Sequence, residues 1–103
     1  MDERRLKGIL GLSVRAGQAV FGEEGCRKAL QNNAGGVLLL DAEASANTRK
    51  RYEELCGRTG HRMALLPAGF LETATGRPGA AMYVKEGSFS TQVIGCLDTD
   101  NKR

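Results

Sequence analysis

The residues with the clearest chemical potential lie between residues 22 and 28, where charged side chains follow a glycine. Gly22 precedes the carboxylates of Glu23 and Glu24, Gly25 follows them, and Lys28 comes four residues after Glu24. Helical periodicity begins here, and the first backbone N–H groups of a helix lack partners within it, so they attract anions. The stretch predicts a helix start that binds an acceptor-rich ligand. The alternative is that both carboxylates only offset the helix dipole.

Two other stretches carry cations or free backbone donors. Ser45, a good helix cap, is followed by the basic cluster Arg49-Lys50-Arg51, and residues Gly76-Arg77-Pro78-Gly79 form a tight loop. In an α/β sandwich the loops at one end of the sheet form one surface. If the three stretches meet there, cations and helix starts would bind RNA phosphates, and carboxylates would accept from guanine N–H groups. The alternatives are a solvated helix face for the cluster and a plain turn for the loop.

Signatures of catalysis are missing from the sequence. No glycine-rich nucleotide-binding motif, nucleophile elbow or metal-ligand spacing occurs. His61 is the only histidine, and we expect a solvated loop residue there rather than a general base. Adjacent glutamates on a helix point in different directions and make poor catalytic pairs. We therefore expect a binding module without enzymatic activity, cofactor, metal or small-molecule substrate.

Composition limits the class of protein and its partners. The 103 residues carry a net charge of +3, which permits a polyanionic partner, and the aromatic content of 5% argues against a base-stacking platform. The cysteines at positions 26, 56 and 96 are far apart, and we expect reduced, mostly buried thiols. No apolar run reaches the length of a membrane span. These features predict a cytoplasmic protein with no membrane partner.

Helices and strands alternate along the chain. Apolar residues at helical spacing predict helices over residues 3–16, 23–32, 46–58 and 67–75, and a last helix marked by Phe89, Val93, Ile94 and Leu97. Gly8 and Gly11 in the first helix would let a neighbouring element approach closely, and Pro67 would begin the fourth helix. Strands are expected over residues 18–21, 37–40, 62–66 and 80–84.

This alternation predicts an α/β fold, a three-layer α/β/α sandwich around a small four-stranded, mixed but mostly parallel sheet. The uninterrupted apolar run Val37–Leu40 is typical of a central parallel strand that is buried on both faces. We expect a single domain over residues 1–103, with a core over about 4–97 and a polar tail over 98–103.

Several of these motifs together resemble a known family. Gly22-Glu-Glu-x-x-x-Lys28, the strand Val37–Leu40 and the loop Ala44-Ser45-x-Asn47-Thr48-x-Lys50 are similar to the kink-turn RNA-binding ribosomal-protein superfamily of archaeal L-seven-Ae and eukaryotic L-thirty-e. The run Leu10-Gly-Leu-x-x-Arg-Ala-Gly17 resembles the bacterial YlxQ-type subgroup in particular. The similarity covers roughly residues 4–97. Archaeal and eukaryotic members have Asn-Glu where this chain has Glu24 and Gly25.

The resemblance implies an α/β/α sandwich without catalysis, whose ligand is kinked RNA with sheared G·A pairs. It places Gly22, Glu23, Glu24, Gly25 and Lys28 at the G·A pairs, and Ser45 and Arg49 beside them. Gly76, Arg77 and Pro78 would form a loop that covers a flipped-out base.

The leading hypothesis is therefore a non-enzymatic, ribosome-associated protein that binds a structured element of ribosomal or messenger RNA. The alternative is a protein–protein interaction module of the same fold that has lost kink-turn specificity, as Glu24 and Gly25 would favour. A substrate-recognition part of an RNA-modifying enzyme ranks last, because these residues leave no room for a catalytic domain.

Overall fold

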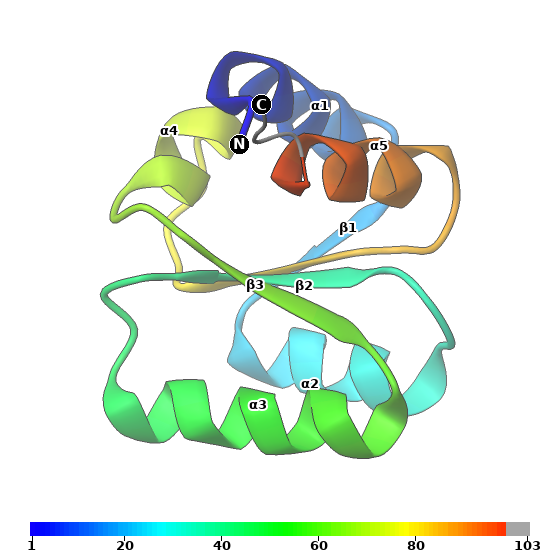
Figure 1. The fold of residues 1–103 in the computed structure, drawn as a ribbon, viewed down its shortest axis with the longest axis vertical. Coiled ribbons are helices and arrows are strands. Elements are labelled where there is room, and N and C mark those ends of the chain that lie inside the picture. Colours follow the sequence, from blue (N-terminus) through cyan, green and yellow to red (C-terminus); the bar gives the residue numbers. More distant parts are fainter. Residues whose placement is uncertain (99–103) are drawn as a thin grey trace.

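The computed structural model describes residues 1–98, in which helices and strands alternate as expected (Figure 1). Of the expected polar tail, only Asp98 is described, where it forms an ion pair with Arg62, and the rest lies outside the described residues. The elements in order are α1 (Glu3–Arg15), β1 (Ala19–Phe21), α2 (Glu23–Asn32), β2 (Val37–Asp41), α3 (Ala46–Thr59), β3 (Arg62–Leu66), α4 (Phe70–Thr75), β4 (Ala81–Val84) and α5 (Ser88–Leu97).

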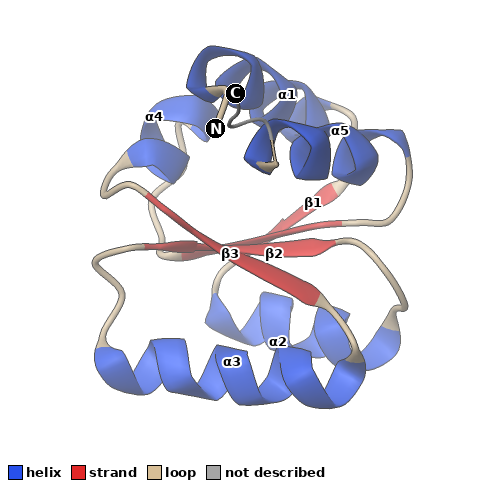
Figure 2. Ribbon diagram, viewed as in Figure 1, coloured by secondary structure: helices blue, strands red, loops and turns tan. Residues whose placement is uncertain are grey.

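The helices cover both faces of the sheet, which confirms the three-layer sandwich. Helices α1, α4 and α5 lie on one face, and α2 and α3 lie on the other (Figure 2). Successive side chains of a strand point to opposite faces, so β2 serves both cores. Val37 and Leu39 pack with the α1, α4 and α5 layer, and Leu38 and Leu40 pack with α2 and α3. No helix within residues 1–98 is long and apolar enough to cross a membrane.

The sheet is mixed, but its parallel share is smaller than the sequence suggested. The strand order is β1-β4-β2-β3. Strands β2 and β3 pair in parallel, whereas β4 is antiparallel to both of its neighbours, β1 and β2. The central strand β2 therefore has one parallel and one antiparallel partner.

The short helix α4 explains the direction of β4. Its six residues span about 9 Å, whereas the five residues of β3 span about 17 Å. The helix is too short to return the chain to the end of the sheet where β3 begins. Strand β4 therefore starts at the end of the sheet where β3 finishes and runs antiparallel to its neighbours. Helix α4 also begins later than expected. The Pro67 carbonyl accepts a hydrogen bond from the N–H of Phe70 at 3.0 Å, so residues 67–69 form a turn.

The expectation of a solvated histidine at position 61 is wrong. His61 is buried, and its ring packs edge-on against Tyr83 with centroids 5.9 Å apart. Its Nε2 lies 2.8 Å from the carbonyl of Asn33, to which it donates, and its Nδ1 lies 2.6 Å from Oγ1 of Thr59. His61 thus joins the ends of α2 and α3, a long-range contact that its position before a strand does not reveal.

Other local expectations have mixed outcomes. A Cβ at Gly11 would lie 3.3 Å from the carbonyl oxygen of Ala74 in α4, which confirms a close approach there, whereas Gly8 has open space beside it. All three cysteines are free and buried. Burial raises the pKa of Cys26 to about 12 and that of Cys56 to about 11, so both are unreactive thiols near neutral pH.

Candidate nucleic-acid interface

The three polar stretches singled out in the sequence leave the sheet at the same edge. Phe21, the last residue of β1, lies opposite Met82, and Leu40 near the end of β2 lies opposite Ala81, the first residue of β4. The N–H of Gly22 donates to the carbonyl of Ala81 at 3.4 Å. The starts of α2 and α3 and the loop before β4 are therefore at one end of the molecule, on the left in Figure 1.

The start of α2 carries charge and leaves its backbone donors without a side-chain cap. Gly22 is the residue before the helix, with a positive φ of 87° that side chains disfavour, and it supplies no capping side chain. The Glu24 carboxylate lies 3.7 Å from the charged groups of both Arg27 and Lys28, and the three side chains are 71%, 52% and 65% exposed. Exposed ion pairs of this kind contribute about 0–1 kcal/mol, so both cations remain free to exchange Glu24 for a phosphate.

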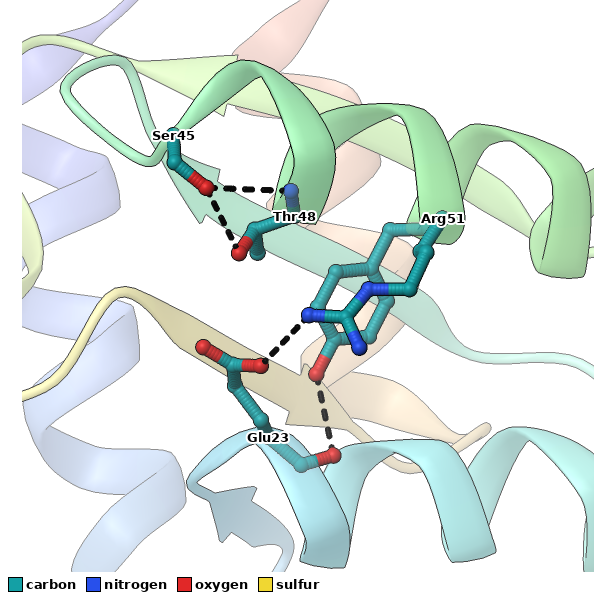
Figure 3. Close-up of polar contacts among 5 residues, drawn as sticks. Glu23, Ser45, Thr48 and Arg51 are labelled. Atoms are coloured by element: carbon teal, nitrogen blue, oxygen red, sulfur yellow. Dashed lines mark hydrogen bonds and ion pairs between the residues drawn. The ribbon is translucent and has the colours of Figure 1, made fainter.

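Glu23 is tied to α3 by two contacts (Figure 3). The hydroxyl of Tyr52 donates to its backbone carbonyl at 3.0 Å, and Nη2 of Arg51 lies 3.4 Å from its carboxylate. Tyr52 is buried, which raises its pKa and keeps the hydroxyl a donor. Glu23 therefore holds α2 against α3, a structural role that competes with ligand binding.

The start of α3 is capped by Ser45, as the sequence predicts. The Ser45 hydroxyl oxygen accepts from the N–H of Thr48 at 3.1 Å, and the hydroxyl donates to Oγ1 of Thr48 at 3.0 Å (Figure 3). Its side chain is thus engaged within the helix. Arg49 lies 3.7 Å from Glu53 in a half-exposed ion pair, so its guanidinium remains accessible at the same end of the molecule.

Gly25 has a packing reason to be glycine. A Cβ at this position would lie 3.0 Å from Cγ1 of Val20 in β1. The missing side chain lets α2 lie close to the strand that precedes it. Gly25 therefore presents backbone rather than a side chain at the candidate site.

The loop before β4 reaches back to the start of α2. Gly76 ends α4 in a left-handed conformation with φ of 74°, and the N–H of Arg77 donates to Oγ1 of Thr75 at 3.2 Å. The Arg77 guanidinium lies over the ring of Phe21, with Cζ 4.5 Å from the centroid. Pro78 is exposed in the same loop. The structure thus brings this loop and the start of α2 together.

Sequence reasoning missed two residues of this site and a groove beside it. Phe21 and Tyr52 have the periodicity of core residues, and only the position of Phe21 directly before Gly22 hinted at the site. A groove of about 330 Å³ runs between α2 and α3. It is lined by Glu23, Glu24, Arg27, Gln31, Arg51, Tyr52, Glu54, Leu55 and Arg58. Within residues 1–98 no cluster of His, Cys, Asp or Glu is placed to hold a metal ion.

Comparison with known proteins finds similarity among solved structures alone. No protein-family model matches the chain, and no curated protein does. The chain is similar to a protein of unknown function from Bacillus halodurans, with 28% sequence identity and a TM-score of 0.85 over 91% of this chain and 97% of that one.

A second similar structure is the archaeal translation termination factor aRF1. The identity is 20% and the TM-score is 0.56, over 73% of this chain and 22% of the factor, so the chain corresponds to one part of a much longer protein. This second likeness is one of fold alone. The chain thus shares its small α/β sandwich with both proteins.

Proposed function

We propose that the protein is a non-enzymatic RNA-binding protein that holds a structured, kinked RNA at the sheet edge described above. The observation that supports this most directly is the meeting of three cation-bearing stretches at one end of the molecule. Lys28, Arg49 and Arg77 come from parts of the chain that are far apart in sequence, and each side chain is exposed. Cations grouped around an uncapped helix start suit the phosphates of a folded RNA.

The electrostatics of the edge favour exchange with a polyanion. Lys28 and Arg49 are held by solvent-exposed glutamates at 3.7 Å, Glu24 and Glu53 respectively. When RNA binds, its phosphates would replace these weak internal partners and release counterions. The net charge of +3 adds modestly to this attraction, so local placement rather than total charge would determine where the RNA lies.

The kind of RNA and its setting follow from the family resemblance. We propose a kink-turn-like element of ribosomal or messenger RNA, bound in the cytoplasm in association with translation. A domain of this fold within an archaeal translation termination factor is compatible with that setting.

The two departures from the family pattern have different consequences in this proposal. Gly25 packs closely against Val20 and has no side chain, so the RNA would meet backbone at that position. Glu24 can accept from guanine N–H groups but cannot donate to the guanine O6 atom. We therefore expect weaker selectivity for G·A pairs than the archaeal and eukaryotic pattern provides.

The test is binding to a short RNA with a kink-turn and to a straight duplex of equal length, measured by fluorescence anisotropy at two salt concentrations. We expect tighter binding to the kinked RNA at both. Equal, salt-sensitive binding to both RNAs would reduce the site to a general basic surface. No binding to either would overturn the proposal.

The groove between α2 and α3 favours a second candidate function, a protein–protein interaction module. Its floor includes the buried residues Tyr52 and Leu55, and three arginines and three glutamates line it. Such mixed charge suits a protein partner better than a polyanion. The ratio of absorbance at 260 and 280 nm after purification separates the two, because an RNA-binding protein would retain nucleic acid and an interaction module would not.

A further inference from the structure

Phe21 is an aromatic residue at the junction of β1 and α2. It ends β1 directly before Gly22, the residue that precedes α2. Its partly buried side chain packs against the core between the sheet and helices α1, α4 and α5. The ring also lies under the guanidinium of Arg77, with Cζ 4.5 Å from its centroid. One aromatic ring thus contacts both the core and an exposed cation of the candidate site.

Arg77 has few other restraints. Its backbone N–H donates to Thr75, and the side chain is exposed in a loop that contains Gly76 and Gly79. A long side chain on such a loop would sample many rotamers, and fixing it on binding would cost entropy. Contact with the face of an aromatic ring restricts those rotamers before a ligand arrives, and a planar guanidinium is well suited to such stacking.

We propose that Phe21 is a positioning residue for RNA binding. Its ring holds the Arg77 guanidinium beside the junction of β1 and α2, so that the cation meets the RNA already in place. This inference rests on the proposed function, and it assigns to Phe21 a role that depends on Arg77. A purely structural Phe21 would support the core in the same way whether or not Arg77 were present, which gives the two roles different experimental signatures.

The experiment is a double-mutant cycle on affinity for the kinked RNA, with Phe21→Leu, Arg77→Ala and the double variant. Phe21→Leu should weaken binding about two- to fivefold and leave the salt slope unchanged, because no charge is lost. Arg77→Ala should weaken binding and lower the slope by about 0.7–0.9. In the Arg77→Ala background, Phe21→Leu should have no further effect. Phe21→Tyr keeps the ring and should bind as the original chain does.

Urea unfolding first establishes that each variant is folded, and NMR of the RNA-free protein tests the contact itself. The ring current of Phe21 should displace the Arg77 Nε–H signal. This displacement should persist in Phe21→Tyr and disappear in Phe21→Leu. Equal losses of affinity from Phe21→Leu with and without Arg77, or no loss at all, would overturn the inference while RNA binding stood. Failure of the original chain to bind kinked RNA would instead overturn the proposed function, whatever the NMR signal showed.

Discussion

The hydroxyl of Tyr52 donates a hydrogen bond to the backbone carbonyl of Glu23 across 3.0 Å, which joins the middle of α3 to the first turn of α2. Arg51, the residue before Tyr52, contacts the Glu23 carboxylate at 3.4 Å. Neighbouring residues of α3 therefore hold both the backbone and the side chain of one residue at the candidate site. The orientation of the α2 start depends on this pair of contacts.

Tyr52→Phe removes the buried contact and keeps the ring. We expect the free energy of unfolding to fall by about 1 kcal/mol, because a net hydrogen bond is lost and packing is retained. Urea denaturation measures the change. Arg51→Ala is the matched control, and it should cost less because the Arg51 and Glu23 side chains are 70% and 55% exposed. A larger loss from Arg51→Ala would contradict the assignment of Tyr52 as the main link.

Gly25→Ala should destabilise the protein although alanine favours helix formation. The new Cβ would lie 3.0 Å from Cγ1 of Val20, so the Val20 side chain must move by a few tenths of an ångström within the packed layer, and overpacking typically costs about 1–3 kcal/mol. Gly57→Ala on α3 is the control, since it has open space and should gain up to about 1 kcal/mol. If both variants were stabilised equally in urea unfolding, the proposed close approach would be wrong.

Lys28→Ala should weaken RNA binding and flatten its dependence on salt. One lost phosphate contact lowers the slope of log affinity against log salt by at most about 0.9. Arg58→Ala removes an exposed charge near the far end of α3, and it should change neither quantity appreciably. Anisotropy titrations at several salt concentrations measure both. An unchanged slope for Lys28→Ala would remove Lys28 from the interface.

Stability should fall as the pH rises above about 9. Burial raises the pKa of Cys26 from 9.0 to about 12 and that of Cys56 from 9.0 to about 11, so the unfolded chain loses these protons first. The stabilisation is fully present below pH 9 and declines by up to about 1.4 kcal/mol per pH unit for each thiol. Urea unfolding at pH 8 and pH 10.5 measures it. Cys26→Ala should show a shallower decline, and an identical decline would exclude Cys26 as a cause.

Features that depend on local sequence could be predicted. Apolar spacing located the helices, the run Val37–Leu40 located the strand buried on both faces, and Ser45 marked the start of α3. These signals are short-range, because periodicity and capping involve residues within a few positions of one another. The largest difference in element bounds is the start of α4. Pro67 favoured a start three residues earlier than the Phe70 start that the structure shows.

Features that depend on long-range neighbours could not be predicted. The burial of His61 rests on Asn33 and Tyr83, and the position of Arg77 rests on Phe21. No local sequence pattern indicates which strands are neighbours in the sheet. The antiparallel direction of β4 therefore could not be predicted either. The meeting of the three stretches at one end of the sheet could be anticipated because they carry charge or glycine. The apolar residues that hold them in place resemble ordinary core residues and gave no such signal.

The central place of β4 also sets the order in which the chain can fold during its synthesis. Strand β1 has β4 as its sheet neighbour, so residues 19–21 remain without a paired strand until residues 81–84 have left the ribosome. The β2–α3–β3 unit can pair much earlier, because its two strands are synthesised close together in the sequence. We expect that unit to be the first to resist proteolysis on a stalled nascent chain. Strand β1 and the start of α2 should be protected only after β4 is inserted between β1 and β2.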